Sequence, residues 1–208
     1  MIKRMMDFAV ALVLLILFSP LMVLVALVTS LDLGRPVFFR QQRPGLHGNL
    51  FTFYKFRTMK DRIGPNGEAL DDRARLTPIS RFIRTASLDE LPSLFNVLKG
   101  DMSLVGPRPL MPQYLSLYTR EQARRHEVRP GVTGLAQVQG RRNLPFSKRL
   151  ELDVYYVEYR SLWLDLKLLL LTIPSVLLAR GAIEPGADVV DDLGLLSSLD
   201  VPDGGKAP

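Results

Sequence analysis

Hydrophobic positions along the chain fall into one continuous run near the N-terminus and a second, interrupted run around residue 170. No charged residue occurs between Phe8 and Leu31, a stretch of 24 residues. A straight helix of that length would be about 36 Å long, which is enough to cross a bilayer core of about 30 Å. The run is too long for the apolar region of a signal peptide, and no A-x-A site follows it. It therefore predicts a membrane segment, and a buried helix of a soluble core is the least favoured alternative.

The middle of this segment is marked by Ser19 and Pro20. A proline removes one backbone donor and clashes with the preceding turn, so it predicts a kink or a break. Basic residues flank both ends, with Lys3 and Arg4 before the run and Arg35 after it, and positive flanks stay cytoplasmic. The pattern leaves two alternatives: a kinked spanning helix, and a re-entrant helix that returns to the side it entered. Both place the rest of the chain in the cytoplasm.

The rest of the chain mixes strand and helix patterns and predicts an α+β fold. Residues 36–42 and 50–58 are rich in Phe, Val, Thr and Tyr, and a Gly- and Pro-containing loop between them predicts a β-hairpin. Thr77 followed by Pro78 predicts a helix start, with the threonine as cap and the proline in the first turn. Another helix is expected over residues 113–127.

One or two further helices are expected over residues 150–179. Aromatic residues gather at the start of this stretch, and a Leu-rich sequence with few charges follows: Tyr155, Tyr156, Tyr159, Trp163 and Leu164 to Leu178. This composition favours helices that lie on a membrane surface, and a buried helix of the soluble core is the alternative.

The composition narrows the chemistry that the chain can perform. It has no Cys and only two His, which excludes disulfides, thiolate nucleophiles and Cys- or His-rich metal sites. The net charge is +6, but residues 181–208 carry six acids and one base, so residues 1–180 carry +11. A body this basic predicts anionic partners, such as nucleic acid, lipid headgroups or phosphorylated substrates. The acidic tail is expected to be flexible.

Two short motifs suggest a site for such an anion. Ser87-Leu-Asp-Glu90 matches a capping box and predicts a helix start that carries the adjacent acids Asp89 and Glu90. Arg108 stands between two prolines, which fix the backbone and suit a guanidinium that binds phosphate at two points. Taken alone, the first motif can be a plain helix start and the second a surface turn.

The run from Thr85 to Pro109 resembles the bacterial sugar transferase family, the monotopic phosphoglycosyl transferases. Supporting matches follow in the same order along the chain: Pro36 to Arg40, Tyr54 to Met59, Arg129 to Gly134 and Leu152 to Tyr156. Together they cover residues 1 to about 180 and resemble the small class, which has one membrane segment and a catalytic body. The resemblance implies a membrane helix over 1–31 and a catalytic domain over 32–180. The acidic tail over 181–208 departs from the family core, so the resemblance says nothing about it.

The resemblance also implies a reaction. A UDP-sugar gives its sugar-1-phosphate to a polyprenol phosphate, with a polyprenyl diphosphosugar and UMP as products, at the start of membrane glycan or glycoconjugate assembly. Asp89 matches the family nucleophile, which would form an aspartyl phosphosugar in a ping-pong cycle. This fits the residues, because without a thiol or a His pair the remaining covalent nucleophile is a carboxylate. Glu90 matches the family acid that is associated with Mg²⁺.

Four basic residues match family positions that we assign to phosphate and nucleotide contacts: Arg84, Arg108, Arg141 and, as a weaker candidate, Lys55. The resemblance favours the re-entrant helix, broken at Ser19-Pro20, and the cytoplasmic face of the bacterial inner membrane. Two other functions stay open, a membrane-tethered nucleic-acid-binding protein and a non-catalytic scaffold for glycan assembly. No nucleic-acid-binding motif is present, so nucleic acid is not expected as a partner. Self-association into a homo-oligomer also stays open.

Overall fold

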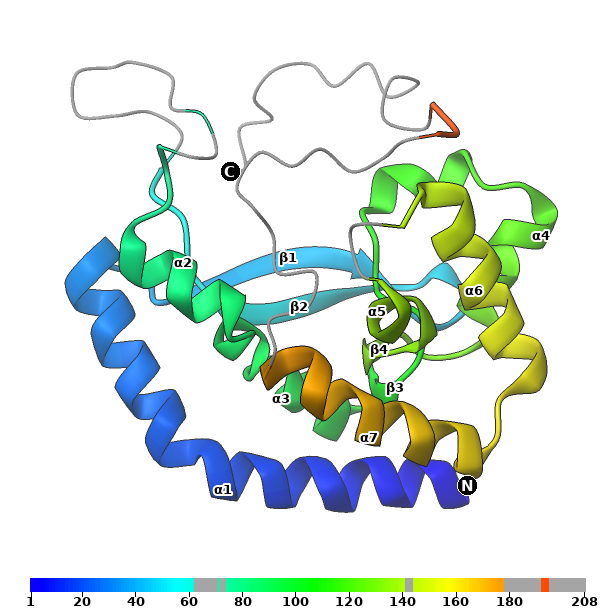
Figure 1. Ribbon diagram of the computed structural model, residues 1–208, viewed down its shortest axis with the longest axis horizontal. Helices are drawn as coiled ribbons and strands as arrows, with labels where there is room; N and C mark the ends of the chain where they lie inside the picture. The colour runs from blue at the N-terminus through cyan, green and yellow to red at the C-terminus, as the bar shows by residue number, and fades with distance from the viewer. Residues whose placement is uncertain (62–70, 72–73, 141–143, 178–191, 195–208) are drawn as a thin grey trace.

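The computed structural model describes residues 1–61, 71, 74–140, 144–177 and 192–194, and it has the expected α+β fold (Figure 1). The helices of the described part are α1 (Ile2–Leu33), α2 (Pro78–Thr85), α3 (Ser93–Lys99), α4 (Arg120–Ala123), α5 (Leu135–Gln139), α6 (Phe146–Tyr159) and α7 (Leu162–Leu177). The strands are β1 (Phe38–Pro44), β2 (Leu50–Phe56), β3 (Ser103–Val105) and β4 (Gly131–Thr133). The expected flexible tail lies outside the described residues, apart from 192–194.

The long helix α1 bends midway along its length (Figure 1). Pro20 lies inside the helix, which runs from Ile2 to Leu33 without interruption, so the expected break at Ser19-Pro20 is a bend in a continuous helix. A proline at position 20 cannot donate to the carbonyl of Ile16, four residues earlier. The Ser19 hydroxyl donates to that same carbonyl oxygen at 2.8 Å. The serine therefore satisfies the acceptor that the proline leaves open at the bend.

The N-terminal end of α1 is bound to the folded body by polar contacts. Arg4 donates to the carbonyl oxygens of Val97 and Leu98 at 2.5 and 2.8 Å, where it caps the C-terminal end of α3. Asp7 is 6% exposed and accepts from the Ser103 hydroxyl at 2.8 Å. The basic residues before the apolar run thus contact protein groups within the body.

The C-terminal end of α1 is bound to the same body at a different place. Thr77 and Ser80, at the start of α2, both donate through their hydroxyls to the Asp32 carboxylate, at 2.5 and 3.1 Å. Thr77 also caps α2 by accepting from the backbone N–H of Ser80, so the predicted helix start is confirmed. Both ends of the apolar helix therefore contact one globular body, and its bend lies between them.

The predicted hairpin is confirmed: β2 begins at the expected residue, and the other three strand ends differ from the expected ones by two residues. Strand β1 pairs antiparallel with β2, and Phe39 lies opposite Lys55 in the register. The outer edge of β2 is bound by Asn96 of α3, which is fully buried. Its amide nitrogen donates to the carbonyl oxygen of Thr52 at 2.7 Å, and its amide oxygen accepts from the N–H of Tyr54 at 3.2 Å. The Asn96 side chain thus fixes strand β2 of the hairpin against α3, the α-helix that follows Asp89.

A second sheet of two short parallel strands, β3 and β4, was not predicted. Its backbones approach so closely that no side chain fits at the crossing. A Cβ atom on Gly131 would lie 2.1 Å from the Gly106 nitrogen, and one on Gly106 would lie 2.4 Å from the Arg129 carbonyl oxygen. The two Gly-containing turns that the sequence presented separately, Gly106-Pro-Arg-Pro109 and Arg129-Pro-Gly-Val-Thr-Gly134, therefore interlock.

The prediction of one helix over residues 113–127 is wrong. The segment folds as a 3₁₀ turn over Pro112–Ser116, the short helix α4 and a second 3₁₀ turn over Arg124–Glu127. A new helix begins after Thr119, which is the N-cap of α4 and forms a capping box with Gln122. The 3₁₀ turn over Pro112–Ser116 therefore ends before it. Of the one or two helices expected over 150–179, the structure has two, α6 and α7. Helix α7 lies along the same side of the molecule as α1 (Figure 1).

Candidate active site

The motif Ser87–Glu90 does not form the predicted capping box. Ser87 has a left-handed backbone, with φ of 57°, and its side chain makes no capping hydrogen bond. Residues Leu88–Glu90 form a single 3₁₀ turn, and α3 begins only at Ser93, after Pro92. The two acids therefore lie on a tight turn between α2 and α3, rather than in the first turn of a helix.

Asp89 on this turn is 6% exposed. Burial, together with the neighbouring Glu90 carboxylate, raises the pKa of Asp89 to about 6, while Lys55, Arg84 and Arg108 act in the opposite direction. Three of the four predicted cations thus act on this acid, although they come from β2, α2 and the loop after β3. At neutral pH the Asp89 carboxylate is mostly ionised, yet it stays basic enough to act as a nucleophile or a base.

Glu90 is paired with Arg108. The guanidinium donates through Nη1 to one carboxylate oxygen at 3.2 Å and through Nη2 to the other. The Glu90 carboxylate raises the pKa of Arg108. The Arg108 side chain is 48% exposed and that of Glu90 is 22% exposed, so the pair lies at the mouth of the site rather than in its interior.

Lys55 reaches the site from strand β2. Its ammonium lies 5.3 Å from the centre of the Phe39 ring on the paired strand. Burial lowers the pKa of Lys55, and the carboxylates of Asp89 and Glu90 partly offset this effect. Arg84 comes from the last turn of α2, three residues before the left-handed Ser87. Arg141, the remaining predicted cation, lies outside the described residues.

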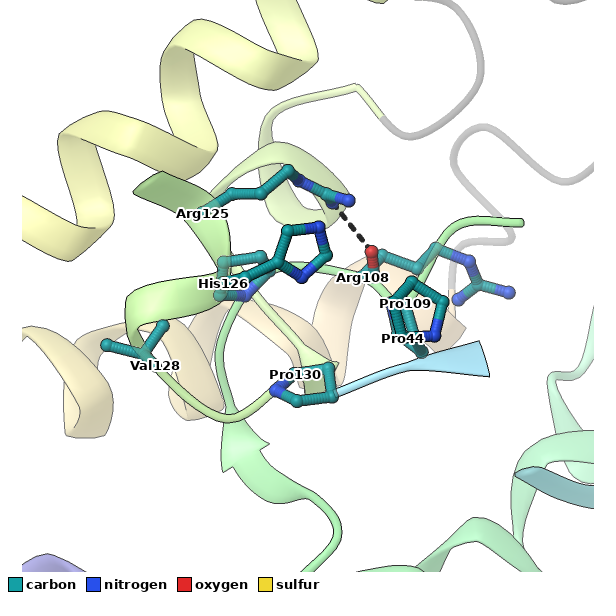
Figure 2. Close-up of a pocket in the computed structure, with 8 residues that line it drawn as sticks. Pro44, Arg108, Pro109, Arg125, His126, Val128 and Pro130 are labelled. Atoms are coloured by element: carbon teal, nitrogen blue, oxygen red, sulfur yellow. Dashed lines mark hydrogen bonds between the residues drawn. The ribbon is translucent and has the colours of Figure 1, made fainter. Parts of the chain in front are cut away.

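The backbone of Arg108 is held by two residues that were not predicted to be site residues from the sequence, Arg125 and Asp153. Arg125 donates to the Arg108 carbonyl oxygen at 2.7 Å, and Figure 2 shows the Arg108 guanidinium extending away from this contact. Arg125 is 2% exposed and forms an ion pair with Asp153 of α6, which is 3% exposed, at 2.7 Å. One signal was available: Asp153 falls on the same helical stripe as Phe146, Leu150 and Val157, a buried apolar face on which an acid needs a partner.

A small pocket lies on this carbonyl side of the loop, lined by Pro44, Pro107, Arg108, Pro109, Arg125, His126, Val128 and Pro130 (Figure 2). The empty space among these residues amounts to about 160 Å³ even when the adjoining open solvent is included. That upper limit is below the roughly 300 Å³ or more of typical ligand pockets. Burial and the adjacent Arg125 lower the pKa of His126 to about 4, so this histidine is neutral at physiological pH. The pocket is therefore packing space behind the loop, and the charged site lies on its other side.

The described part of the chain holds no cluster of side chains that would by itself form a complete metal cage. No group of three or more His, Cys, Asp or Glu side chains lies together there. Magnesium, however, is commonly held by one or two carboxylates together with substrate phosphates and water. The adjacent carboxylates of Asp89 and Glu90 fit that donor set, whereas they do not fit a metal that needs a complete protein cage.

Residues 1–179 of the chain match the model of the bacterial sugar transferase family. The chain belongs to this family. An uncharacterized sugar transferase of Bacillus subtilis is 54% identical over 86% of this chain and 89% of its own length. A UDP-glucose:undecaprenyl-phosphate glucose-1-phosphate transferase of Caulobacter vibrioides is 45% identical over 86% of this chain and 71% of its own length.

Longer members of the bacterial sugar transferase family share the same region. An undecaprenyl-phosphate galactose phosphotransferase of Salmonella typhimurium is 40% identical over 87% of this chain but only 41% of its own length. The matched part includes the α1 helix, which is long and apolar enough to cross a membrane by length and composition. The protein is therefore a transferase whose family region includes both the apolar helix and the charged site around Asp89.

Proposed function

We propose that the protein transfers a sugar-1-phosphate from a UDP-sugar to polyprenol phosphate, giving a polyprenyl diphosphosugar and UMP. The printed activities of the relatives from Caulobacter vibrioides and Salmonella typhimurium support this reaction class. The observation that carries the proposal is the environment of Asp89. A buried carboxylate with a raised pKa, next to Lys55, Arg84 and Arg108, suits nucleophilic attack on a phosphate that cations neutralise.

In the first step, an Asp89 carboxylate oxygen attacks the phosphorus that carries the sugar. A new P–O bond forms to Asp89, the P–O bond to the UMP phosphate breaks, and UMP leaves with the bonding electrons. The aspartyl phosphosugar stays on the enzyme. Lys55 and Arg108 offset the negative charge that builds up on the phosphoryl oxygens and on the leaving phosphate. No proton needs to leave Asp89, because its carboxylate is mostly ionised at neutral pH.

In the second step, a phosphate oxygen of polyprenol phosphate attacks the same phosphorus. The P–O bond to Asp89 breaks and the carboxylate is regenerated, so the enzyme returns to its starting state. The product keeps the sugar phosphate as part of a diphosphate. A ping-pong cycle follows from this order, because UMP must leave before the lipid phosphate occupies the same position.

We further propose that Glu90, with Asp89 beside it, holds Mg²⁺ together with substrate phosphates. The ion supplies positive charge that a diphosphate needs when it is cleaved. In the described structure Glu90 is paired with Arg108, which presents a guanidinium to the mouth of the site. Arg84 and Arg108 orient phosphate oxygens in this proposal, and Arg141 is assigned the same role from the family match alone.

We propose that α1 is a re-entrant membrane helix and that the body lies on the cytoplasmic face of the inner membrane. Support comes from the contacts of its two ends, because Arg4 near one end and Asp32 at the other both bind the same globular body. A straight spanning helix would place those ends on opposite sides of the bilayer. Large apolar side chains on α1, α2 and α7 are exposed, as expected where a protein faces a membrane: Leu17, Val23, Leu27, Phe82, Trp163, Leu170 and Ile173.

The experiment that tests the reaction is a panel of UDP-sugars incubated with polyprenol phosphate and the full-length protein in detergent. We expect UMP release from at least one sugar nucleotide, dependent on the lipid phosphate for sustained turnover. Release of UDP would instead indicate transfer of the sugar alone and would reject the proposal. Asp89→Asn is the matched control, because it keeps the shape of the side chain and removes the attacking carboxylate.

A further inference from the structure

The face of the hairpin that carries Lys55 also carries a second cation. Residues directly opposite each other in an antiparallel pair point to the same face, and alternate residues of one strand share that face. Lys55 lies opposite Phe39, and Arg43 lies opposite Phe51. Because 39, 41 and 43 alternate along β1, Arg43 and Lys55 share one face of the hairpin. Phe53, which is 8% exposed, stands between them on that face.

Arg43 reaches from this face towards the site. Pro44, the residue that follows Arg43, lines the same pocket as Arg108 and Pro109. The Arg43 guanidinium also interacts electrostatically with Arg108, Glu90 and Tyr114. Its Nη2 donates to the side-chain oxygen of Gln41 at 2.6 Å. Its buried Nε atom has no hydrogen-bond partner among the residues that the structure describes. A buried N–H donor on a cation is costly to leave unsatisfied, so this atom calls for an acceptor.

The charges around Arg43 favour an anionic acceptor. Burial, and then the neighbouring Arg108 guanidinium, lower the pKa of Arg43 to about 10. Two guanidiniums and one carboxylate, Glu90, therefore leave an excess of positive charge at this end of the site. A phosphate oxygen would supply the missing acceptor and would offset the repulsion between the two guanidiniums.

We propose that Arg43 is a further phosphate-binding residue of the Asp89 site, acting beside Arg108. The inference rests on the proposed function for the identity of the substrate, and it names a residue that the family resemblance did not supply. The ligand chemistry is a phosphate oxyanion, which either the diphosphate of the nucleotide sugar or the phosphate of the polyprenol can provide. Arg43 and Lys55 would then contact the substrate from opposite ends of one hairpin face.

The test measures binding by full-length protein in detergent, with no need for turnover. UDP serves as the probe for the nucleotide diphosphate, and polyprenyl phosphate serves as the probe for the lipid phosphate. The variants are Arg43→Ala and Arg43→Lys, with Arg40→Ala as the matched control. Arg40 lies on the same strand but on the opposite face, with its guanidinium carbon 5.9 Å from the centre of the Tyr54 ring.

We expect Arg43→Ala to weaken the binding of one of the two probes by about 10- to 100-fold, as the loss of a charge-assisted hydrogen bond predicts. The probe that weakens identifies the source of the phosphate. Arg43→Lys should restore only part of the affinity, because an ammonium lacks the planar fork. Affinities for both probes equal to those of Arg40→Ala would overturn the proposal.

Two further readouts keep the result interpretable. Thermal unfolding of each variant shows whether the fold is intact, and if Arg43→Ala does not fold, Arg43→Lys decides, with wild-type affinity for both probes overturning the proposal. Asp89→Asn should still bind UDP in an Arg43-dependent manner. The Arg43 site can therefore be supported even if no sugar nucleotide is turned over, which separates its failure from failure of the proposed reaction.

Discussion

Arg108 donates from both terminal nitrogens of its guanidinium to the Glu90 carboxylate, so the cation proposed to hold phosphate is paired with the acid proposed to hold metal. The pair keeps each charge satisfied near the surface before substrate arrives. Because both partners are partly exposed, separating them costs little compared with a buried pair. Substrate binding can therefore replace the Arg108–Glu90 contacts with contacts from Arg108 to phosphate and from Glu90 to the metal ion.

Arg108 is expected to act mainly in substrate binding. Arg108→Ala should raise the UDP-sugar concentration needed for half-maximal rate by about 10- to 100-fold, since a charge-assisted hydrogen bond contributes roughly 1.5–3 kcal/mol. Arg108→Lys should restore part of this loss. Steady-state kinetics check the prediction, with Arg124→Ala as control because Arg124 pairs with the surface acids Glu121 and Glu158. Wild-type kinetics in Arg108→Ala would make Arg108 a surface turn residue.

The ion pair between Arg125 and Asp153 is expected to position Arg108, because Arg125 also binds the Arg108 carbonyl oxygen. Asp153→Ala leaves Arg125 buried without its carboxylate, which should lower the free energy of unfolding by about 3–5 kcal/mol. The double variant Arg125→Met with Asp153→Leu should recover much of that stability, because two packed apolar groups replace the charges. It should nevertheless keep a raised KM for UDP-sugar, because the Arg108 carbonyl loses its 2.7 Å donor. A double variant with wild-type KM would show that the pair is only structural.

The acid side of the pH–rate profile is expected to report Asp89. Its pKa of about 6 predicts that kcat/KM falls by about tenfold for each pH unit below 6, as the nucleophile becomes protonated. A profile that stays flat down to pH 5 would contradict the assignment of this carboxylate as nucleophile.

The Asp89 carboxyl group should also make the free energy of unfolding depend on pH. Because the pKa of Asp89 is higher in the folded protein than its ordinary value of 3.8, the folded state binds the proton more tightly. The resulting loss of stability develops as the pH rises from about 4 to about 6. Asp89→Asn should therefore be more stable than wild type at pH 7, by up to about 3 kcal/mol, and no more stable at pH 3.5. Chemical unfolding at the two pH values measures the difference.

The topology of α1 is accessible to labelling because the chain has no cysteine of its own. Ile2→Cys and Arg35→Cys flank the apolar helix on its two sides. If the helix is re-entrant, both cysteines should react with a membrane-impermeant reagent only in inside-out vesicles. Reaction of Ile2→Cys from the outside of intact cells would instead show that the helix spans the bilayer.

The parts of the fold that could be predicted are those specified by local chemistry. Thr77-Pro78 caps a helix wherever the rest of the chain lies, and the alternating aromatic strands form a hairpin through a short turn. The single helix expected over 113–127 failed because the apolar spacing concealed a restart at Thr119. The capping box failed for a similar reason, since its sequence pattern does not reveal the left-handed backbone of Ser87.

Contacts between distant segments could not be predicted from single motifs. The β3–β4 pair joins residues far apart in the sequence, and its glycines are required by a backbone approach that only the folded chain shows. Of the site residues, Asp89, Glu90, Arg84, Arg108 and Lys55 were predicted from motif resemblance, and the structure brings them together. Arg43 was overlooked because its position on the Lys55 face depends on the strand register, and Arg125 because its partner Asp153 lies on another helix.

The central claim, that Asp89 forms a covalent bond to the sugar phosphate, can be measured directly. Wild-type protein is mixed with a UDP-sugar that releases UMP, in the absence of polyprenol phosphate, and is then digested and analysed by mass spectrometry. We predict that the peptide containing Asp89 gains the mass of one sugar phosphate, and that adding polyprenol phosphate removes it. Asp89→Asn should show no adduct. An adduct on another residue, or an Asp89→Asn enzyme that turns over at the wild-type rate, would contradict the account.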